Sequence, residues 1–188
     1  IHDFLAKHAD VDLVCHDENW IINGQNKGKK SYGPYKTYKD LLFKGNCIST
    51  SATVVRTTKL LEVGLFSENL DFNGVEDYEL WLRLSKISKI EYLHQVLGEY
   101  NVHGGGVTSN IILHSKNAMN VLNYHLSMWR NKNLYFRMLM RRRRADILRG
   151  AGRNLLKTGD VVTGRKYLKA ALLAYPLSIK NILLYLLR

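Results

Sequence analysis

Cysteine and long apolar runs are both scarce in this chain of 188 residues, and each shortage excludes a class of protein. The two cysteines, Cys15 and Cys47, lie among apolar or small residues, with no metal-ligand spacing around them. We therefore expect reduced thiols in a core and a cytoplasmic protein. A membrane-spanning helix needs about 18 uninterrupted apolar residues. The best candidate, 179–187, is interrupted by Lys180 and Asn181, so we expect no membrane span.

Acidic residues are scarce in the last third of the chain. Positions 1–126 carry 13 Lys and Arg against 14 Asp and Glu, whereas positions 127–188 carry 15 against 2. The net charge of +12 therefore divides into −1 and +13, and the basicity belongs to the tail. Proteins that track phosphates place positive charge on the domain that docks, so the near-neutral front part argues against nucleic acid as a partner.

The basic tail has two interpretations that the sequence leaves open. Polybasic segments are attracted to anionic lipid, which makes an anionic membrane surface a partner and predicts a peripheral protein on the inner face of the membrane. The Arg141–Arg144 quartet can equally be a solvated helix face. It has no base-stacking aromatics interleaved with its charges, which again disfavours nucleic acid.

The apolar content of 46% is enough for a packed core, and the front part shows alternating helical and strand patterns. Helical spacing over 1–9 precedes a short buried strand over 11–15, an order that indicates an α/β sheet. The Gly-, Lys- and Asn-rich stretch 23–38 predicts a long surface loop. The chain opens at Ile1 without an apolar signal segment, so we expect a piece of a longer polypeptide.

Periodicity and β-branched content predict the remaining elements. They are a short helix over 37–43, a strand over 48–56, a helical turn over 59–63, one or two strands over 90–100 and a helix over 111–128. Gly64 permits the left-handed conformation that ends the helical turn, and Phe66 is expected to pack into the core. We expect His114 and His125 on the polar face of their helix.

The most informative stretch of the chain is 75–84. Asn73-Gly74 breaks the chain just before it, and Glu76 and Asp77 then fall in a first helical turn. Apolar residues recur after them at helical spacing, namely Leu80, Trp81, Leu84 and Ile87. The pattern predicts an amphipathic helix with Trp81 in the core. Taken alone, the two acids need only complement the helix dipole.

Three segments together resemble a known family. They are NCISTSATVVR at 46–56, EVGLFSE at 62–68 and EDYELWLR at 76–83. In this order they resemble the C-terminal half of a family-2 inverting glycosyltransferase of the GT-A fold. The resemblance implies an α/β fold, with part of a GT-A catalytic domain over 1–110. Charge and periodicity predict a basic α-helical extension over 111–188.

The resemblance also implies an activity and a set of site residues. A sugar would pass with inversion from a nucleotide-sugar donor to a hydroxyl of a saccharide or lipid-linked acceptor, as in cell-surface polysaccharide biosynthesis. Asp77 would be the general base, with Glu76 as the neighbour that orients loop or acceptor. Asn46 and Ser49 would contact the acceptor. His103, which precedes three glycines, would contact the diphosphate or a divalent metal ion, Mg or Mn.

Simpler interpretations stand beside these assignments. Asn46 can be a turn cap, and His103 can be a loop histidine without a ligand. Asp17 follows the strand over 11–15, where it faces an acceptor pocket or belongs to a solvated loop. Asp10-Val11-Asp12 matches the residue types of the family's Asp-x-Asp metal motif. It lies at the start of a strand, however, and in the family the motif precedes that strand.

Two further expectations concern the extent of the molecule. The family's metal motif and donor-binding half would precede residue 1, so we expect this chain by itself to be inactive. Residues 145–175 resemble one tetratricopeptide-type helical hairpin, a pattern that small-residue helix packing also produces. The alternative function is a peripheral membrane or protein-interaction module built on the basic helical tail.

Overall fold

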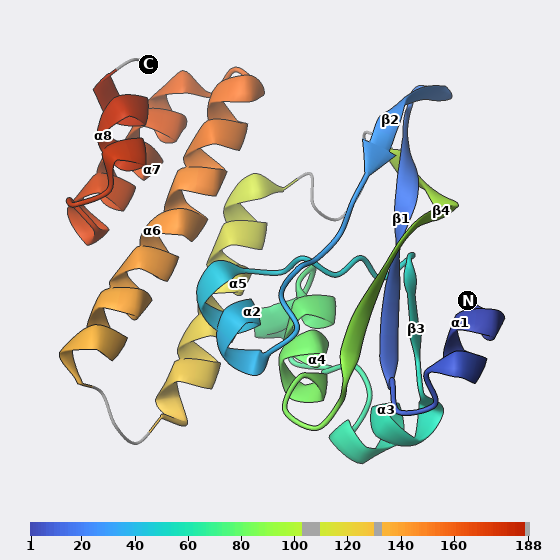
Figure 1. Ribbon diagram of the computed structural model, residues 1–188. Helices are drawn as coiled ribbons and strands as arrows, with labels where there is room; N and C mark the ends of the chain where they lie inside the picture. Colours follow the sequence, from blue (N-terminus) through green and yellow to red (C-terminus); the bar gives the residue numbers. More distant parts are fainter. Residues whose placement is uncertain (103–109, 130–132, 187–188) are drawn as a thin grey trace. The chain divides into compact units, whose positions relative to one another are not determined.

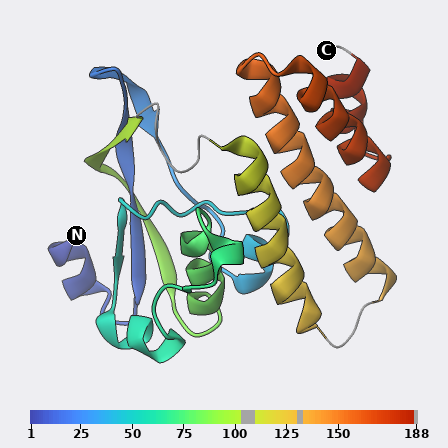
Figure 2. The same ribbon diagram turned by 180° about the vertical axis from the view of Figure 1, so that it is seen from behind.

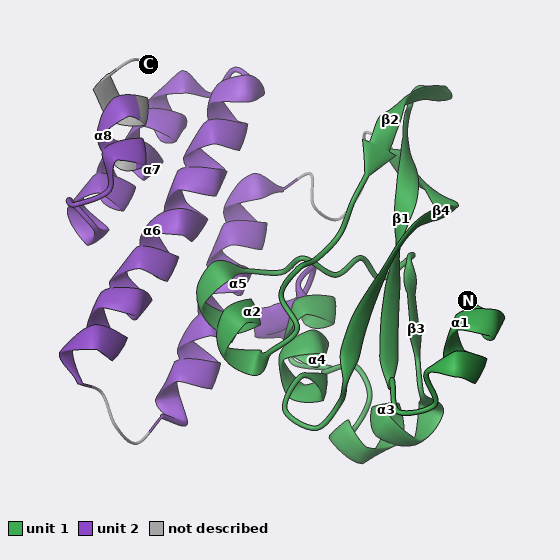
Figure 3. Ribbon diagram, viewed as in Figure 1, with its two compact units in different colours: residues 1–69, 76–109 green, residues 70–75, 110–188 purple. Residues whose placement is uncertain are grey.

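The computed structural model describes residues 1–102, 110–129 and 133–186, and it shows a mixed α/β protein (Figure 1). The chain folds as two compact units, coloured separately in Figure 3. Unit 1 comprises residues 1–69 and 76–109, and unit 2 comprises residues 70–75 and 110–188. The short segment 70–75 thus belongs with the helical unit, although the predicted boundary at residue 110 placed it in the catalytic part.

Unit 1 is built on an open four-stranded mixed sheet. Its elements are α1 (His2–Lys7), β1 (Leu13–Ile22), β2 (Gln25–Lys30), α2 (Tyr38–Lys44), β3 (Thr53–Val55), α3 (Thr57–Val63), α4 (Glu76–Leu84) and β4 (Ile90–Val102). Figures 1 and 2 show α2 and α4 on one side of the sheet and α1 on the other. The α/β class expected from the sequence is therefore confirmed.

Strand β1 is the centre of the sheet. It pairs in parallel with β4 along its whole length, from Leu13 to Ile22. It also pairs antiparallel with β3 over Leu13 to Cys15, and with β2 from Glu18 onward. Because β4 occupies one edge of β1 throughout, β2 and β3 must share the other edge at opposite ends. The edge near His16 and Asp17 therefore lacks a strand partner on that side.

Two predictions for this region were wrong. The strand was expected to end at Cys15, but β1 continues to Ile22 through residues 16–18, and the Asp17 and Glu18 side chains are each only 1% exposed. Charged residues in a strand usually mark its end, but here hydrogen bonds inside the protein replace those to water. The stretch 23–38 was expected to be a loop throughout, yet residues 25–30 form β2 and pair with β1.

The other predictions for unit 1 have mixed outcomes. The Thr37 side chain caps α2 by accepting from Asp40 N, and Gly64 ends α3 in the left-handed conformation with φ 86°, as expected. The strand over 48–56 shrinks to β3, because residues 48–52 are irregular. Phe66 is 44% exposed and does not pack into the core, so that prediction was wrong.

Helix α4 is the predicted amphipathic helix, and Leu80, Trp81 and Leu84 are buried in it. Ile87 lies beyond its end and is exposed, so the apolar pattern overran the helix. Arg83 pairs with the buried Glu79 on the same helix, with Nη2 and Oε2 2.7 Å apart.

The same guanidinium also ties α4 to the end of α3. Arg83 Nη1 donates to Val63 O, and its Nη2 donates to Leu65 O at 2.6 Å. These are carbonyls of the turn around Gly64 that the helix leaves without a partner. The Arg83 side chain therefore fixes the position of α3 on α4.

Unit 2 is helical, with η1 (Leu70–Phe72), α5 (Ile111–Ser127), α6 (Leu134–Lys157), α7 (Val161–Ala174) and α8 (Ile179–Leu186). Within it the Phe72 and Tyr124 rings lie 5.5 Å apart, and Asn117 Nδ2 donates to Asn73 O at 2.8 Å. His125 is fully buried, so its expected place on a polar face was wrong. No helix among the described residues is long and apolar enough to cross a membrane.

Helices α6 and α7 form a close hairpin in unit 2. A methyl group added at Gly152 would lie 2.9 Å from the Leu168 side chain and 3.0 Å from the Gly164 carbonyl oxygen. One added at Gly164 would lie 2.8 Å from the Leu156 side chain. Two glycines facing each other therefore set the separation of these helices, as small residues do at close helix crossings.

Candidate functional site

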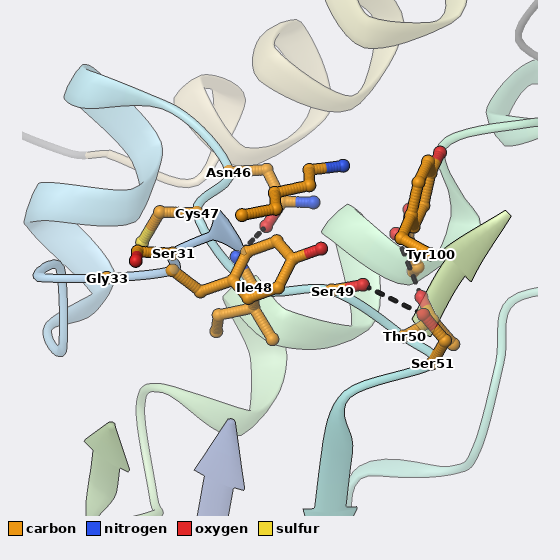
Figure 4. Close-up of a pocket in the computed structure, with 12 residues that line it drawn as sticks. Ser31, Gly33, Asn46, Cys47, Ile48, Ser49, Thr50, Ser51 and Tyr100 are labelled. Atoms are coloured by element: carbon orange, nitrogen blue, oxygen red, sulfur yellow. Dashed lines mark hydrogen bonds between the residues drawn. The ribbon is translucent and has the colours of Figure 1, made fainter. Parts of the chain in front are cut away.

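A pocket of about 630 Å³ opens in unit 1, beside the edge of β1 that has no strand partner at its middle. The chain leaves the sheet at the end of β2 and returns to it in β3, and the residues between supply most of the lining. The lining residues are Lys30, Ser31, Tyr32, Gly33, Asn46, Cys47, Ile48, Ser49, Thr50, Ser51, Asp77 and Tyr100. Figure 4 shows the Asn46–Ser51 segment running across the pocket, with the Tyr100 ring at its right.

Glu18 holds three hydroxyl groups of this region together. Its Oε2 accepts hydrogen bonds from the Tyr32 hydroxyl at 2.6 Å and from Ser49 Oγ at 3.0 Å. Its Oε1 accepts from Ser51 Oγ at 2.8 Å. A buried carboxylate is costly unless it is hydrogen-bonded, and three donors offset much of that cost. Glu18 therefore positions three side chains that line the pocket, although it is not itself a lining residue.

Asp77 reaches the pocket from the first turn of α4. Its Oδ1 accepts from Tyr78 N at 2.6 Å, and its Oδ2 accepts from Thr50 Oγ1 at 3.1 Å. The positive end of the helix dipole favours a carboxylate at this position. A carboxylate oxygen can accept a second hydrogen bond, so an incoming hydroxyl can donate to Oδ2 beside Thr50. Asp77 is the only carboxylate among the described residues that line this pocket.

Lys30 and two tyrosines form an aromatic and cationic side of the pocket. The Lys30 Nζ lies 3.5 Å from the centroid of the Tyr100 ring and 5.5 Å from that of Tyr32. Burial lowers the pKa of Lys30, against the pull of Glu18. Burial and the hydrogen bond to Glu18 raise the pKa of the Tyr32 hydroxyl well above its usual range. The tyrosine thus stays protonated and keeps donating to Glu18.

Asp17 lies next to the pocket residues without lining the pocket. Its Oδ2 pairs with Lys29 Nζ at 2.6 Å, and its Oδ1 accepts from Tyr32 N at 3.2 Å. Burial alone would raise the pKa of this carboxyl, but the hydrogen bonds from Lys29 and Tyr32 hold the pKa below its usual value. Asp17 therefore fixes the chain where it leaves β2, directly before Tyr32.

The register of β4 is irregular opposite this part of β1. Asp17 is paired with Val96 and Glu18 with Gly98, and the register shifts on both sides of Asp17. A methyl group at Gly98 would lie 3.2 Å from the His16 ring. Bulges redirect side chains and are common beside functional sites. Here the irregular stretch of β4 lies opposite the two buried acids Asp17 and Glu18.

The structure brings three of the six predicted site residues into one pocket, namely Asn46, Ser49 and Asp77. Asn46 Oδ1 accepts from Ile48 N at 3.0 Å, which is the turn cap considered above, and the amide nitrogen remains available to a ligand. Glu76 does not line the pocket, and its Oε2 is buried without a hydrogen-bond partner among the described residues. His103 lies outside the described residues.

Sequence reasoning missed five residues of the site: Glu18, Lys30, Tyr32, Ser51 and Tyr100. Glu18 belongs to the charged run 16–18, a pattern that indicates the end of a strand and not its continuation. Lys30 and Tyr32 lay in a stretch taken to be a solvated loop. Hairpin signals at Asn23-Gly24 were the one available clue, because such a turn brings the following residues back along β1.

Within the described ranges, no group of three or more His, Cys, Asp and Glu side chains could hold a metal ion. No protein-family model matches the chain, and no curated protein matches it significantly.

Proposed function

We propose that this chain forms the acceptor side of an inverting glycosyltransferase similar to family 2 of the GT-A fold. The observation that supports the proposal best is the position of Asp77, at a helix N-terminus and at the wall of a pocket lined with hydroxyl groups. Saccharide acceptors present hydroxyl groups and apolar ring faces. The pocket offers hydrogen-bonding partners for the hydroxyl groups and half-buried tyrosine rings for the apolar faces. The order of the family-like segments is the second support.

In the proposed reaction, Asp77 accepts the proton of an acceptor hydroxyl. The acceptor oxygen forms a bond to the anomeric carbon of the donor sugar from the face opposite the diphosphate. The bond between that carbon and the diphosphate oxygen breaks, and the electron pair leaves with the nucleoside diphosphate. Thr50 orients the base by donating to Oδ2 at 3.1 Å. We assign no step to a metal ion.

The other lining residues would bind and orient the acceptor. The Asn46 amide nitrogen and the Ser49 hydroxyl are polar groups at the pocket wall, and the Tyr100 ring is a flat apolar surface on which a sugar ring can stack. Lys30 lies against that ring and adds positive charge to the same side. Glu18 would act through Ser49, Ser51 and Tyr32, as a positioning residue.

The test is an Asp77→Asn substitution in the full-length polypeptide that carries this chain. Asparagine keeps the shape of the side chain but cannot accept the proton, so turnover should fall by roughly 10²- to 10⁴-fold, with acceptor KM and thermal midpoint near those of the unsubstituted protein. Asp3→Asn makes the same chemical change at an exposed position outside the pocket, so it is the matched control and should leave turnover unchanged. Near-normal turnover in Asp77→Asn would exclude the general base.

Acceptor binding provides a separate test on the chain of 188 residues itself. Titration with a panel of oligosaccharides, followed by NMR, should perturb Tyr100 and the Asn46–Ser51 segment. Tyr100→Ala should weaken the binding by about 2- to 10-fold, because an aromatic contact contributes about 0.5–1.5 kcal/mol. Binding that is unaffected by Tyr100→Ala would show that the acceptor lies elsewhere.

A further inference from the structure

The last two helices of unit 2 carry basic residues and no acidic ones. Residues 161–188 contain five Lys and Arg and no Asp or Glu. The nearest acid, Asp160, is used as the N-cap of α7, where its Oδ1 accepts from Thr163 N at 3.0 Å. Helices α7 and α8 therefore contribute positive charge and no negative charge from their own residues.

Helix α7 has a buried side and an exposed side. Gly164, Leu168 and Ala171 are buried, and Leu168 and Gly164 meet α6. On the exposed side lie Val162, Lys166, Lys169 and Leu173, at spacings of four, three and four residues that place them on one helix face. Two aliphatic side chains thus bracket two lysines on a single exposed stripe.

The same mixture continues beyond α7. The exposed residues there are Leu177, Ile179, Lys180, Ile182 and Leu183. Leu177 is 81% exposed, Ile179 72% and Leu173 68%, so these are not the edges of core residues. None of Lys166, Lys169 and Lys180 forms an ion pair within the part of the chain that the structure describes. We define the α7–α8 face as the nine exposed residues Val162, Lys166, Lys169, Leu173, Leu177, Ile179, Lys180, Ile182 and Leu183.

We propose that the α7–α8 face docks on an anionic lipid bilayer. Exposed aliphatic side chains gain by entering the boundary between headgroups and acyl chains, while lysines beside them pair with anionic headgroups. A helix surface that carries aliphatic side chains and lysines but no acidic residue fits such a boundary. The aliphatic side chains contact acyl chains, and the lysines contact anionic headgroups. The proposal does not depend on the glycosyltransferase assignment, since it rests on unit 2 alone.

Flotation of the 188-residue chain with lipid vesicles tests the proposal. The chain should float with phosphatidylcholine vesicles that contain about 30% phosphatidylglycerol and stay unbound with phosphatidylcholine alone, because headgroup charge supplies much of the attraction. Raising the salt concentration from about 50 to about 300 mM should weaken the binding through screening. Vesicle binding that is equal with and without anionic lipid would overturn the proposal.

Matched variants separate this face from the general basicity of unit 2. Lys166→Glu with Lys169→Glu should reduce partitioning by about 30-fold or more, since each lysine near the surface contributes about 5-fold. Lys7→Glu with Lys27→Glu makes the same change of net charge on unit 1 and should reduce it much less. Equal losses in the two double variants would mean that total charge, not this face, controls the binding.

The aliphatic residues have a test of their own. Leu173→Ser with Leu177→Ser removes two exposed side chains, so folding should be unchanged in a thermal melt while partitioning into anionic vesicles falls by about 10-fold or more. Sedimentation without lipid tests the other possible occupant of the face, a second copy of this chain. Self-association that the same double substitution abolishes, together with unchanged vesicle binding, would assign the face to a second copy of this chain and overturn the proposal.

Discussion

At the scale of single residues, Glu18 connects the sheet to the pocket. Its carboxylate sits on β1 with almost no solvent exposure, and it accepts from Tyr32, Ser49 and Ser51, which come from two separate loop segments. A hydroxyl can rotate to find another acceptor only if one is near. Glu18 is the acceptor that all three hydroxyls share, and Ser49 Oγ and Ser51 Oγ also lie 3.1 Å apart, so the hydroxyls form one network centred on Glu18.

We predict that Glu18→Gln destabilises the chain. The amide replaces one acceptor oxygen by a donor, so the three hydrogen bonds that the Glu18 carboxylate accepts cannot all persist, and we expect a cost of about 1–3 kcal/mol in the free energy of unfolding. Urea denaturation measures this. Glu99→Gln, at an exposed position on β4, is the control and should change stability by less than about 0.5 kcal/mol. Equal effects of the two substitutions would show that the hydroxyl network adds nothing.

Asp17 provides a prediction about pH. Its pKa in the folded chain is below the ordinary value of 3.8, because the hydrogen bonds from Lys29 and Tyr32 outweigh burial. A carboxyl with a lowered pKa stabilises the fold above its unfolded pKa, and this contribution is lost as pH falls through the folded pKa. Stability should therefore decline below about pH 4.

The measurement for Asp17 is the thermal midpoint between about pH 6 and pH 3. Asp17→Asn cannot titrate, so its midpoint should be lower at neutral pH and should decline less steeply in acid than that of the unsubstituted chain. Asp3→Asn, at an exposed position, leaves the pH dependence almost unchanged. If Asp17→Asn and the unsubstituted chain decline in parallel, the ion pair with Lys29 does not contribute to the pH dependence.

At the scale of elements, helix packing depends on a few side chains whose contacts could not be predicted from the family-like segments. Arg83, the last residue of the family-like EDYELWLR segment, is committed to Glu79 and to the carbonyls of Val63 and Leu65. Its role in the described structure is to join α3 to α4. The helix that presents Asp77 is held by this contact and by the buried side chains of Leu80 and Trp81.

Two glycines of α6 should respond in opposite ways to alanine. Gly150 has no atom within 4 Å of an added methyl group, so Gly150→Ala should stabilise the chain by up to about 1 kcal/mol through helix propensity. At Gly152 the same methyl group would press on Leu168 and the Gly164 carbonyl, and overpacking of this kind costs about 1–3 kcal/mol. Gly152→Ala should therefore have a lower thermal midpoint than Gly150→Ala. Equal midpoints would mean that the hairpin has room to separate.

At the scale of the whole molecule, charge is divided between the two units. Unit 1 has 12 Lys and Arg against 13 Asp and Glu, and unit 2 has 16 against 3, which gives net charges of −1 and +13. Concentrated charge of one sign destabilises a compact unit through self-repulsion, and salt screens it. Repulsion among the basic residues should therefore lower the stability of unit 2 more than that of unit 1.

We predict that salt stabilises unit 2 more than unit 1. Raising the salt concentration from about 20 to about 200 mM should increase the protection of α6 and α7 amides against hydrogen exchange by an amount equivalent to about 1 kcal/mol. The amides of α4, in the nearly neutral unit 1, should change much less. Uniform changes across both units would show that salt acts on the chain as a whole and not through the charge of unit 2.

Local signals along the chain were sufficient for most helices and for the fold class. Thr37 before α2, Gly64 after α3 and the apolar spacing of α4 act within a few residues, so their outcome could be predicted without knowing what lies across the sheet. Asn46, Ser49 and Asp77 were predicted from the order of the family-like segments, and all three line the pocket. Their roles in the proposed reaction remain predictions.

Three features could be predicted from the chain alone: the elements whose stability comes from neighbouring residues, the division of charge between front and tail, and the acids at the start of α4. The folded arrangement buries Asp17 and Glu18 in a strand, because their burial depends on residues that are distant in sequence, namely Lys29, Tyr32, Ser49 and Ser51. It also decided that His125 is buried and Phe66 exposed. A charged or polar side chain enters a core when its partners arrive from elsewhere in the chain, and no local pattern records those partners.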